Sequence, residues 1–180
     1  MEVLVNLNKN DILQEVSKTS AYIGVKAITQ DGNGNFYWNI AVTKEEQEML
    51  DRFWKEACAN IANSAHEYLK KTTKITGKDA ESFMVSLEMP YGYNMASNTQ
   101  IYQYAYSYVV SYILMKWLIV CGFASNMDLY VSTTAGNLKS FADSLRMRSF
   151  GGMAIKTGSN VFGEDEPQNV GAVDVIIKEL

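Results

Sequence analysis

Apolar residues recur at helical spacing over three stretches of the chain. They lie three or four positions apart over residues 11–23, 43–69 and 135–147, which places them on one face of a helix. A fourth stretch, residues 101–124, is apolar around its whole circumference and carries a single charge, Lys116. The pattern therefore predicts a mainly helical chain in which this fourth helix is buried among the others.

Capping residues predict where several of these helices begin and end. The segments 43–46 (TKEE) and 97–100 (SNTQ) match the capping box, in which a Ser or Thr and a Glu or Gln bond the free amides of the first turn. Gly24 and Gly122 follow apolar helical stretches, and glycine readily adopts the left-handed conformation of a helix C-terminus. We expect helices to start at the two boxes and to stop at the two glycines.

Alternating apolar and polar residues predict strands at several places. Residues 1–8, 72–89 and 173–177 alternate in this way. Residues 25–42 contain two further runs around the sequence DGNG, which is typical of the turn in a β-hairpin. The strand at 173–177 is too short to stand alone, so it must pair with its own sheet or with a neighbouring subunit.

Together these elements predict an α+β fold that is mainly helical. We expect a small helical bundle with a β-hairpin and short strands over residues 1–150. Residues 151–180 are rich in glycine and polar residues, which predicts a flexible, extended C-terminal arm with a final short strand. A chain of 180 residues is long enough to bury a substantial core in one domain.

Composition and charge exclude several classes of protein. Hydrophobic residues make up 47% of the chain, as in a globular protein. The net charge of −4 is unfavourable for a free-standing DNA-binding protein, because phosphate contacts supply most of the non-specific affinity. The first residues carry no basic segment followed by a long apolar run, so no secretion signal is expected. Lys116 in the middle of the apolar helix opposes a membrane span.

No motif in the sequence predicts a catalytic, cofactor-binding or metal site. His66 is the only histidine, and with Cys58 and Cys121 it falls short of the four ligands that zinc sites usually use. A calcium loop starting at Asp31 would require glycine and glutamate where Phe36 and Val42 stand. We therefore expect no enzyme, no cofactor and no metal. A small intracellular enzyme or regulator with a pocket near His66 and Cys58 is one alternative.

Tyrosines concentrate in the fourth apolar stretch. Tyr104, Tyr108 and Tyr112 are four residues apart and lie on one stripe of the expected helix. Tyrosine combines a large apolar body with a polar tip, which suits a surface buried against a partner. Stacking on single-stranded nucleic acid would need interleaved basic residues, which this stretch lacks. We predict that the stripe is an interface between subunits; burial within one subunit is the simpler alternative.

The sequences VNLNKNDILQEVSKTSAYIG (residues 5–24) and TKEEQEMLDRFWKEACANI (residues 43–61) resemble small proteins of tailed phages. These proteins are encoded in the late structural gene clusters of phages and prophages of Bacteroides-type gut bacteria, including the crAss-like phages. The resemblance covers mainly residues 1–70. It implies a structural protein of the virion, specifically a head–tail connector or neck ring subunit.

Several expectations follow from this resemblance. It implies a homo-oligomeric ring, expected to be a dodecamer, that contacts the portal protein and neighbouring neck or tail proteins. It implies that DNA passes nearby without sequence-specific binding and that no membrane is involved. The expected location is the neck or tail region of the virion, after synthesis in the host cytoplasm. The resemblance brings over no catalytic residues, and a tail-completion or assembly protein of the same phage is the alternative.

Overall fold

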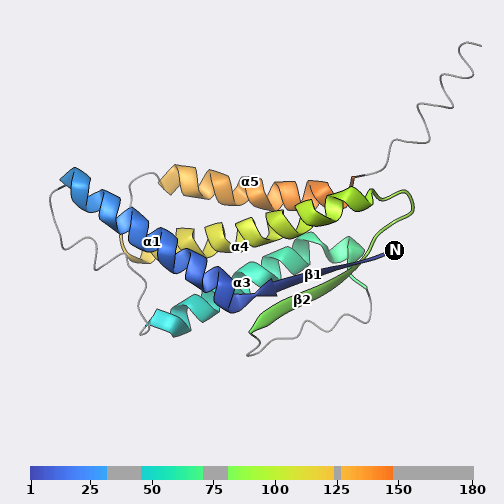
Figure 1. The fold of residues 1–180 in the computed structure, drawn as a ribbon, viewed down its shortest axis with the longest axis horizontal. Helices are drawn as coiled ribbons and strands as arrows, with labels where there is room; N and C mark the ends of the chain where they lie inside the picture. Colours follow the sequence, from blue (N-terminus) through green and yellow to red (C-terminus); the bar gives the residue numbers. More distant parts are fainter. Residues whose placement is uncertain (32–45, 71–80, 124–126, 148–180) are drawn as a thin grey trace, which may run out of the picture. The chain divides into compact units, whose positions relative to one another are not determined.

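The computed structural model describes residues 1–31, 46–70, 81–123 and 127–147, and the side chains of all of these except 26–31. All of them belong to one compact unit, Met1–Met147. The elements, in chain order, are β1 (Glu2–Asn8), α1 (Lys9–Asp31), α3 (Gln47–Ser64), the 3-10 turn η2 (His66–Tyr68), β2 (Ser82–Glu88), the 3-10 turn η3 (Met95–Ser97), α4 (Asn98–Val120) and α5 (Met127–Leu145) (Figure 1). The mainly helical α+β fold is confirmed; the arm expected over residues 151–180 lies outside the described residues.

The sheet pairs two strands that are far apart in the sequence. β1 and β2 run antiparallel, with Val5 opposite Val85 at the centre of the ladder. Each strand alternates buried and exposed residues, so one face of the sheet lies against the core and the other faces solvent. This confirms the strand expected over residues 1–8 and the second half of the one expected over 72–89. Residues 71–80 lie outside the described part of the chain.

The hairpin expected over residues 25–42 is wrong where it can be compared, because α1 continues through Asp31. Gly24 does not end the helix. It is buried, four residues after the buried Ser20, on the same row as Ile12 and Val16. Gly24 therefore belongs to the buried face of α1, where it is the smallest residue, and does not end the helix. The rest of the proposed hairpin, residues 32–42, lies outside the described residues.

The helix expected over 43–69 is shorter at both ends. α3 begins at Gln47, and Glu46 makes no capping hydrogen bond through its side chain; Thr43 lies outside the described residues. At the other end, Leu69 adopts an extended conformation and forms a bridge with Leu87 of β2. The Lys70 N–H also donates to the Ser86 carbonyl at 3.3 Å. Leu69 and Lys70 thus pair with β2 instead of continuing the helix that the apolar spacing predicted.

The capping prediction at Ser97 is also wrong. Ser97 has helical dihedral angles and makes no capping bond, because the turn η3 already leads into α4. Its hydroxyl lies 3.3 Å from the Met147 sulfur instead. The Asn94 side chain accepts the Ala96 N–H and so caps η3. At the other end of α4 the prediction is confirmed, since Gly122 has a φ of 71° directly after the helix.

The last helix begins eight residues before its expected start at Ala135. Residues 127–134 had the polar, β-branched composition of a loop, yet they form the first two turns of α5. Two hydroxyls in this segment bond to helix carbonyls: Ser132 donates to Leu129 at 3.0 Å, and Thr134 donates to Tyr130 at 2.8 Å. These bonds satisfy the hydroxyls, and packing on α4 overcomes the low helix propensity of the segment.

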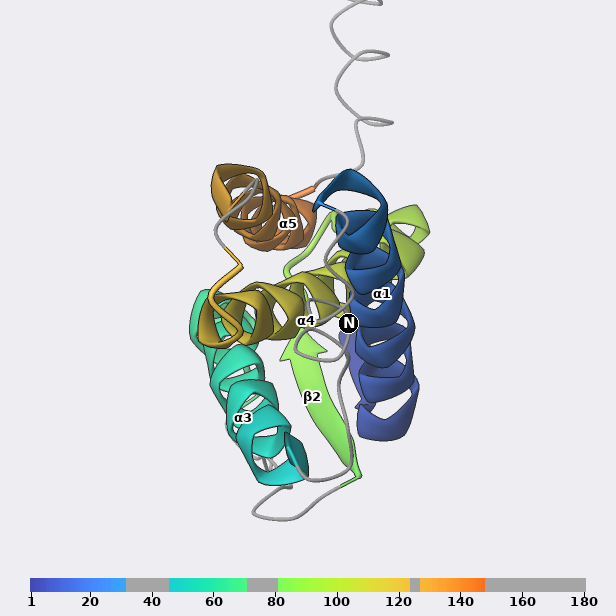
Figure 2. The same ribbon diagram turned by 90° about the vertical axis from the view of Figure 1, so that its left-hand side faces the viewer.

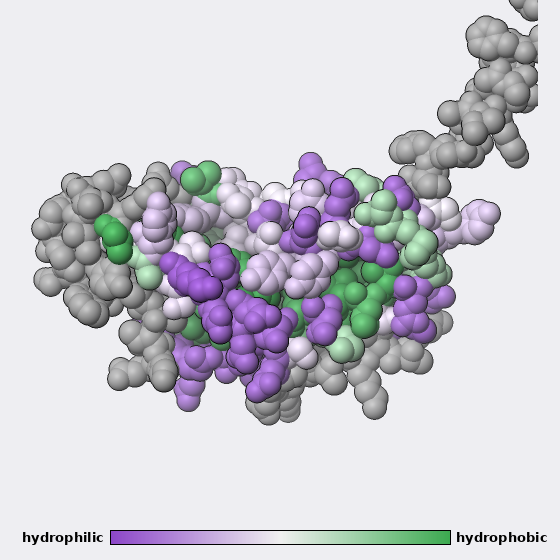
Figure 3. Space-filling view, in the orientation of Figure 1, coloured by the Kyte–Doolittle hydropathy of each residue, from purple (hydrophilic) through white to green (hydrophobic). Residues whose placement is uncertain are grey.

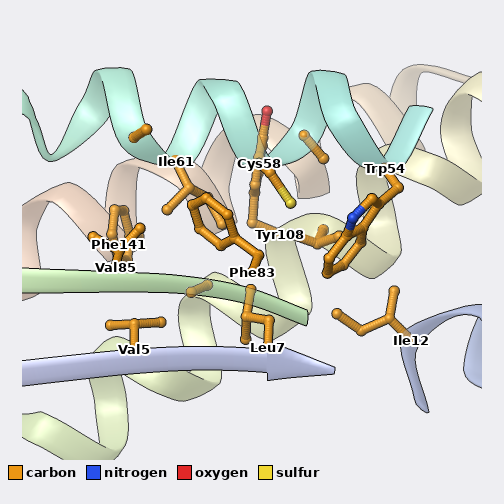
Figure 4. Packing of buried hydrophobic residues seen from close by; sticks show 14 of the residues in the cluster. Val5, Leu7, Ile12, Trp54, Cys58, Ile61, Phe83, Val85, Tyr108 and Phe141 are labelled. Atoms are coloured by element: carbon orange, nitrogen blue, oxygen red, sulfur yellow. The ribbon is translucent and has the colours of Figure 1, made fainter. Parts of the chain in front are cut away.

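α4 lies at the centre of the fold. It packs between α5 on one side and α1, α3 and the sheet on the others (Figures 1 and 2). The residues on its row Ile101, Ala105, Val109 and Ile113 are all fully buried. Below it, Val5 and Leu7 of β1 and Phe83 and Val85 of β2 meet the inner face of α3 around Cys58 and Ile61 (Figure 4). The helix expected to be most buried is the one around which the core forms.

The two leucines of β1 give a matched test of this packing. Leu7 is 0% exposed and Leu4 is 58% exposed. We expect Leu7→Ala to lower the free energy of unfolding by about 2–5 kcal/mol, because it removes buried methyl groups and leaves a cavity. Leu4→Ala should change the stability of the isolated subunit by about 0.5 kcal/mol or less. Urea unfolding at low protein concentration measures both; equal effects would contradict the strand orientation described here.

Candidate assembly surface

The tyrosine stripe of α4 is largely occupied inside the subunit. Tyr108 is 2% exposed, and its hydroxyl accepts a hydrogen bond of 2.9 Å from the Asn60 side chain of α3. In Figure 4 its ring extends from α4 with the oxygen at α3. Burial raises the pKa of the Tyr108 hydroxyl, which therefore stays neutral at physiological pH. A residue with no free surface in the subunit cannot lose surface to a partner, so Tyr108 is not available as an interface residue.

Tyr112 continues this contact with α3 one turn later. Its hydroxyl donates to the Glu56 carboxylate at 3.0 Å, and its ring lies 5.7 Å from that of Tyr108. Burial, and then the bond to Glu56, raise its pKa. Tyr104 and Tyr112 are half-buried, so each keeps some exposed surface. For these two residues the interface stays a prediction.

Lys116, the charge in the apolar helix, lies beside the same carboxylate. Its ammonium nitrogen is 3.8 Å from Glu56 Oε2 and 5.5 Å from the centre of the Tyr112 ring. The lysine is thus matched by a charge and a ring on the α3 side of the subunit. Among the helices that the structure describes, none combines the length and apolarity needed to span a membrane.

The three residues considered for chemistry differ in their surroundings. Cys58 is buried, and burial raises the pKa of its thiol to about 12. His66 is exposed, and its ring Nδ1 lies 2.9 Å from the Asn63 carbonyl. Burial, and then the charge of Glu46, raise the pKa of Cys121 to about 11. Nucleophilic cysteines need a lowered pKa, so neither thiol has the character of a nucleophile.

Metal ligands do not gather either, as far as the chain is described. Within residues 1–31, 46–70, 81–123 and 127–147, no group of three or more His, Cys, Asp or Glu side chains is placed to hold a metal ion. Two acidic residues of α3 form ion pairs instead. Asp51 lies 2.7 Å from Lys9 of α1, and Glu56 lies 3.9 Å from Arg52 on its own helix.

Exposed apolar side chains gather at one end of the α4–α5 pair. We call this group the 119–131 patch; its members are Ile119, Val120, Leu129 and Val131. Leu129 is the most exposed of them, at 61%. Two of these residues end α4 and two begin α5, and the helices run antiparallel, so all four lie at the same end (Figure 1). The sequence did not indicate the 119–131 patch, because helical spacing predicted this helix only from residue 135.

A second exposed apolar group lies at the opposite end of the same two helices. We call it the 91–147 patch; its members are Tyr91, Met95 and Met147. Met147 is held at the start of α4 by a contact of its sulfur with Ser97 and by a 3.5 Å hydrogen bond from the Asn94 N–H to its carbonyl. The 23 residues of α4 separate the two patches by about 35 Å at 1.5 Å per residue. The subunit therefore has two different apolar ends.

Comparisons of the chain with protein-family models, with curated proteins and with solved structures found no match. The geometry of the described residues is therefore what distinguishes the possible functions. Its main features are the 119–131 patch, the 91–147 patch and the buried contact of Tyr108 with Asn60.

The Asn60–Tyr108 hydrogen bond should contribute measurably to stability. We expect Tyr108→Phe to lower the free energy of unfolding by about 1 kcal/mol, because the Asn60 amide loses its acceptor in a partly buried position. Tyr112→Phe is the matched control. Its partner Glu56 is accessible to water, so this substitution should lower the free energy of unfolding by less. A double-mutant cycle with Asn60→Ala measures the coupling; a coupling of zero would contradict the bond.

Thiol labelling tests the alternative that Cys58 is a catalytic nucleophile. At pH 8 we expect iodoacetamide to modify Cys58 and Cys121 more slowly in the folded protein than in urea, because burial raises both pKa values. Cys58, which is more deeply buried, should be the slower of the two. Mass spectrometry of the digested protein follows each site. Rapid modification of Cys58 in the folded protein would favour the enzyme alternative.

Proposed function

We propose that this chain is a non-enzymatic structural subunit of a tailed-phage virion, which assembles as a ring in the neck between the portal protein and the tail. The observation that carries the proposal is the presence of two different apolar patches at opposite ends of the α4–α5 pair. Large exposed apolar patches mark protein–protein contacts, and the exposed side chains at each end are proposed to form one.

The positions of the patches support a ring in particular. A two-fold dimer uses the same surface on both subunits, whereas a head-to-tail contact uses two different surfaces and closes into a ring when the rotation between subunits permits. The 119–131 patch and the 91–147 patch differ in composition, since one is aliphatic and the other contains two methionines and a tyrosine. When the 119–131 patch of one copy contacts the 91–147 patch of the next, both apolar patches are buried.

The resemblance of residues 5–24 and 43–61 to phage neck proteins supports the location in the virion. Residues 5–24 and 47–61 of these segments lie in β1, α1 and α3, which pack around α4. The net charge of −4 fits a channel through which DNA slides without being held, because phosphate contacts would retain it. Portal and neighbouring neck or tail proteins are the proposed partners, and a dodecamer is the proposed ring.

Charge substitutions in α5 test the assembly. Leu129→Glu places a charge in the 119–131 patch, and we expect self-association to weaken at least tenfold. Lys139→Glu is the matched control: Lys139 is exposed on the same helix but lies eight residues, about 12 Å, beyond Val131, the last residue of the patch. Multi-angle light scattering over a concentration series measures both variants beside the wild type, and circular dichroism confirms their folding. A wild type that stays monomeric at every concentration, alone and with portal protein, would contradict the proposal.

A second measurement tests the location independently of assembly. We expect mass spectrometry of purified phage particles to detect the chain, and cryo-electron microscopy of the neck to place it there. Detection in the tail alone would favour the tail-completion alternative. Absence from the particles would exclude a virion component.

A further inference from the structure

Among the described residues, no hydrogen bond reaches the backbone groups on the outer edge of β1. Met1 and Met89 exchange two backbone hydrogen bonds, of 2.7 and 3.4 Å, and the Lys9 N–H donates to the Glu81 carbonyl at 2.8 Å. Since antiparallel ladders alternate with a period of two, the odd-numbered residues of β1 direct their N–H and C=O groups at β2. The backbone groups of Glu2, Leu4 and Asn6 therefore point to the other edge.

The two edges of the sheet differ. The outer edge of β2 is covered by Leu69 and Lys70, through the bridge to Leu87 and the bond to the Ser86 carbonyl. No described group bonds the outward backbone of β1. α1 continues from the end of the strand and runs away from it instead of alongside it (Figure 1). Leu4, 58% exposed, lies in the middle of this edge, and Figure 3 shows apolar surface on the face where β1 runs.

Apart from the charge of Glu2 at its start, the edge lacks several features that protect a free strand. Native edge strands avoid association by means of charged side chains, especially lysine, or by proline or a bulge. The interior of β1 contains none of these, and its register with β2 is continuous from Glu2 to Asn8. Exposed edges of this kind bind an additional strand through main-chain hydrogen bonds, with alternate side chains giving specificity.

The segment that fits this edge is residues 173–178 of the same sequence, VDVIIK. Placed antiparallel with Ile176 opposite Leu4, it sets Lys178 opposite Glu2 and Asp174 opposite Asn6. Its other face, Val173, Val175 and Ile177, then continues the buried row of β1. A parallel placement would instead set Asp174 against Glu2, and like charges directly opposite are destabilising. The antiparallel register avoids this like-charge pair at Glu2, whose carboxylate already binds Lys70 at 2.6 Å.

The length of the chain allows the segment to come from another subunit. Residues 148–172 separate Met147 from the segment, and these 25 residues span up to about 80 Å when extended. That distance exceeds the length of α4 about twofold. In a ring, each subunit would donate one strand and accept one, as a closed head-to-tail contact requires.

We propose that the outer edge of β1 accepts residues 173–178 of a neighbouring copy as a third, antiparallel strand, with Leu4 opposite Ile176. The inference rests on the proposed assembly, because a neighbouring copy must be present. The added strand places β1 at the centre of a three-stranded sheet and supplies partners for the backbone of Glu2, Leu4 and Asn6.

Disulfide trapping tests the register and the donor together. Two full-length variants, Leu4→Cys and Ile176→Cys, are mixed at a concentration where the wild type is assembled, and oxidised mildly. Paired residues of an antiparallel ladder have Cα atoms about 5.5 Å apart, within the range of a disulfide. We expect a covalent dimer whose digest contains the 4–176 cross-link. Met84→Cys, on the same face of the sheet but in β2, is the matched control and should cross-link at least tenfold less.

The outcomes separate this inference from the proposed function. Assembly that persists without a 4–176 cross-link overturns the strand exchange but leaves the ring intact. A chain carrying both cysteines that forms the disulfide only within itself, even when assembled, overturns exchange between copies. Equal cross-linking by Met84→Cys overturns the register. A chain that never assembles would contradict the proposed function, and it would also contradict the strand exchange, which needs a neighbouring copy.

Discussion

The fold depends on covering α4 on all sides. Most amphipathic helices turn one polar face to water, but α4 is apolar over most of its circumference, and Tyr102, Gln103 and Ser107 are its only exposed residues between the first and the last turn. Four other elements must therefore surround it: α5 on one side, and α1, α3 and the sheet on the others. Small residues help them approach, since Ala105 lies in the fully buried row of α4 and Gly24 in that of α1. The remaining elements are held together mainly through this one helix.

Polar groups on α4 orient the elements that cover it. Towards α3, Tyr108 accepts from Asn60, and Tyr112 donates to Glu56. Towards α5, the Asn137 amide donates to the Ser107 carbonyl and to the Ser111 hydroxyl, both at 3.3 Å. Apolar contact alone would tolerate rotation and sliding of the helices, whereas each of these bonds is satisfied in one arrangement only. The tyrosines thus define how α3 lies on α4, which the periodicity of the stripe could not show.

The sequence predicted the positions of helices and strands better than the contacts between them. Alternation located β1 and β2, but nothing in it indicated that residues about 80 positions apart would pair with each other. Helical spacing located α3 and α4. It failed at Gly24 and at residues 127–134, because there packing against α4 overrides local preference. The capping box at Ser97 failed for a similar reason, since a 3-10 turn formed ahead of it. The 119–131 patch forms because α5 starts at Met127, a start that the periodicity of the sequence does not indicate.

The two kinds of unsatisfied surface would contribute differently to an assembly. Apolar patches such as 119–131 supply affinity that depends mainly on buried area, and they discriminate poorly between partners of similar hydrophobicity. An open strand edge supplies directional bonds with a register, because a slip by one residue moves every side chain to the opposite face. β1 is paired on one edge only, and a two-stranded sheet is marginal without further cover. A subunit that combines both surfaces therefore has a source of affinity and a separate source of alignment, which a closed ring of identical copies requires.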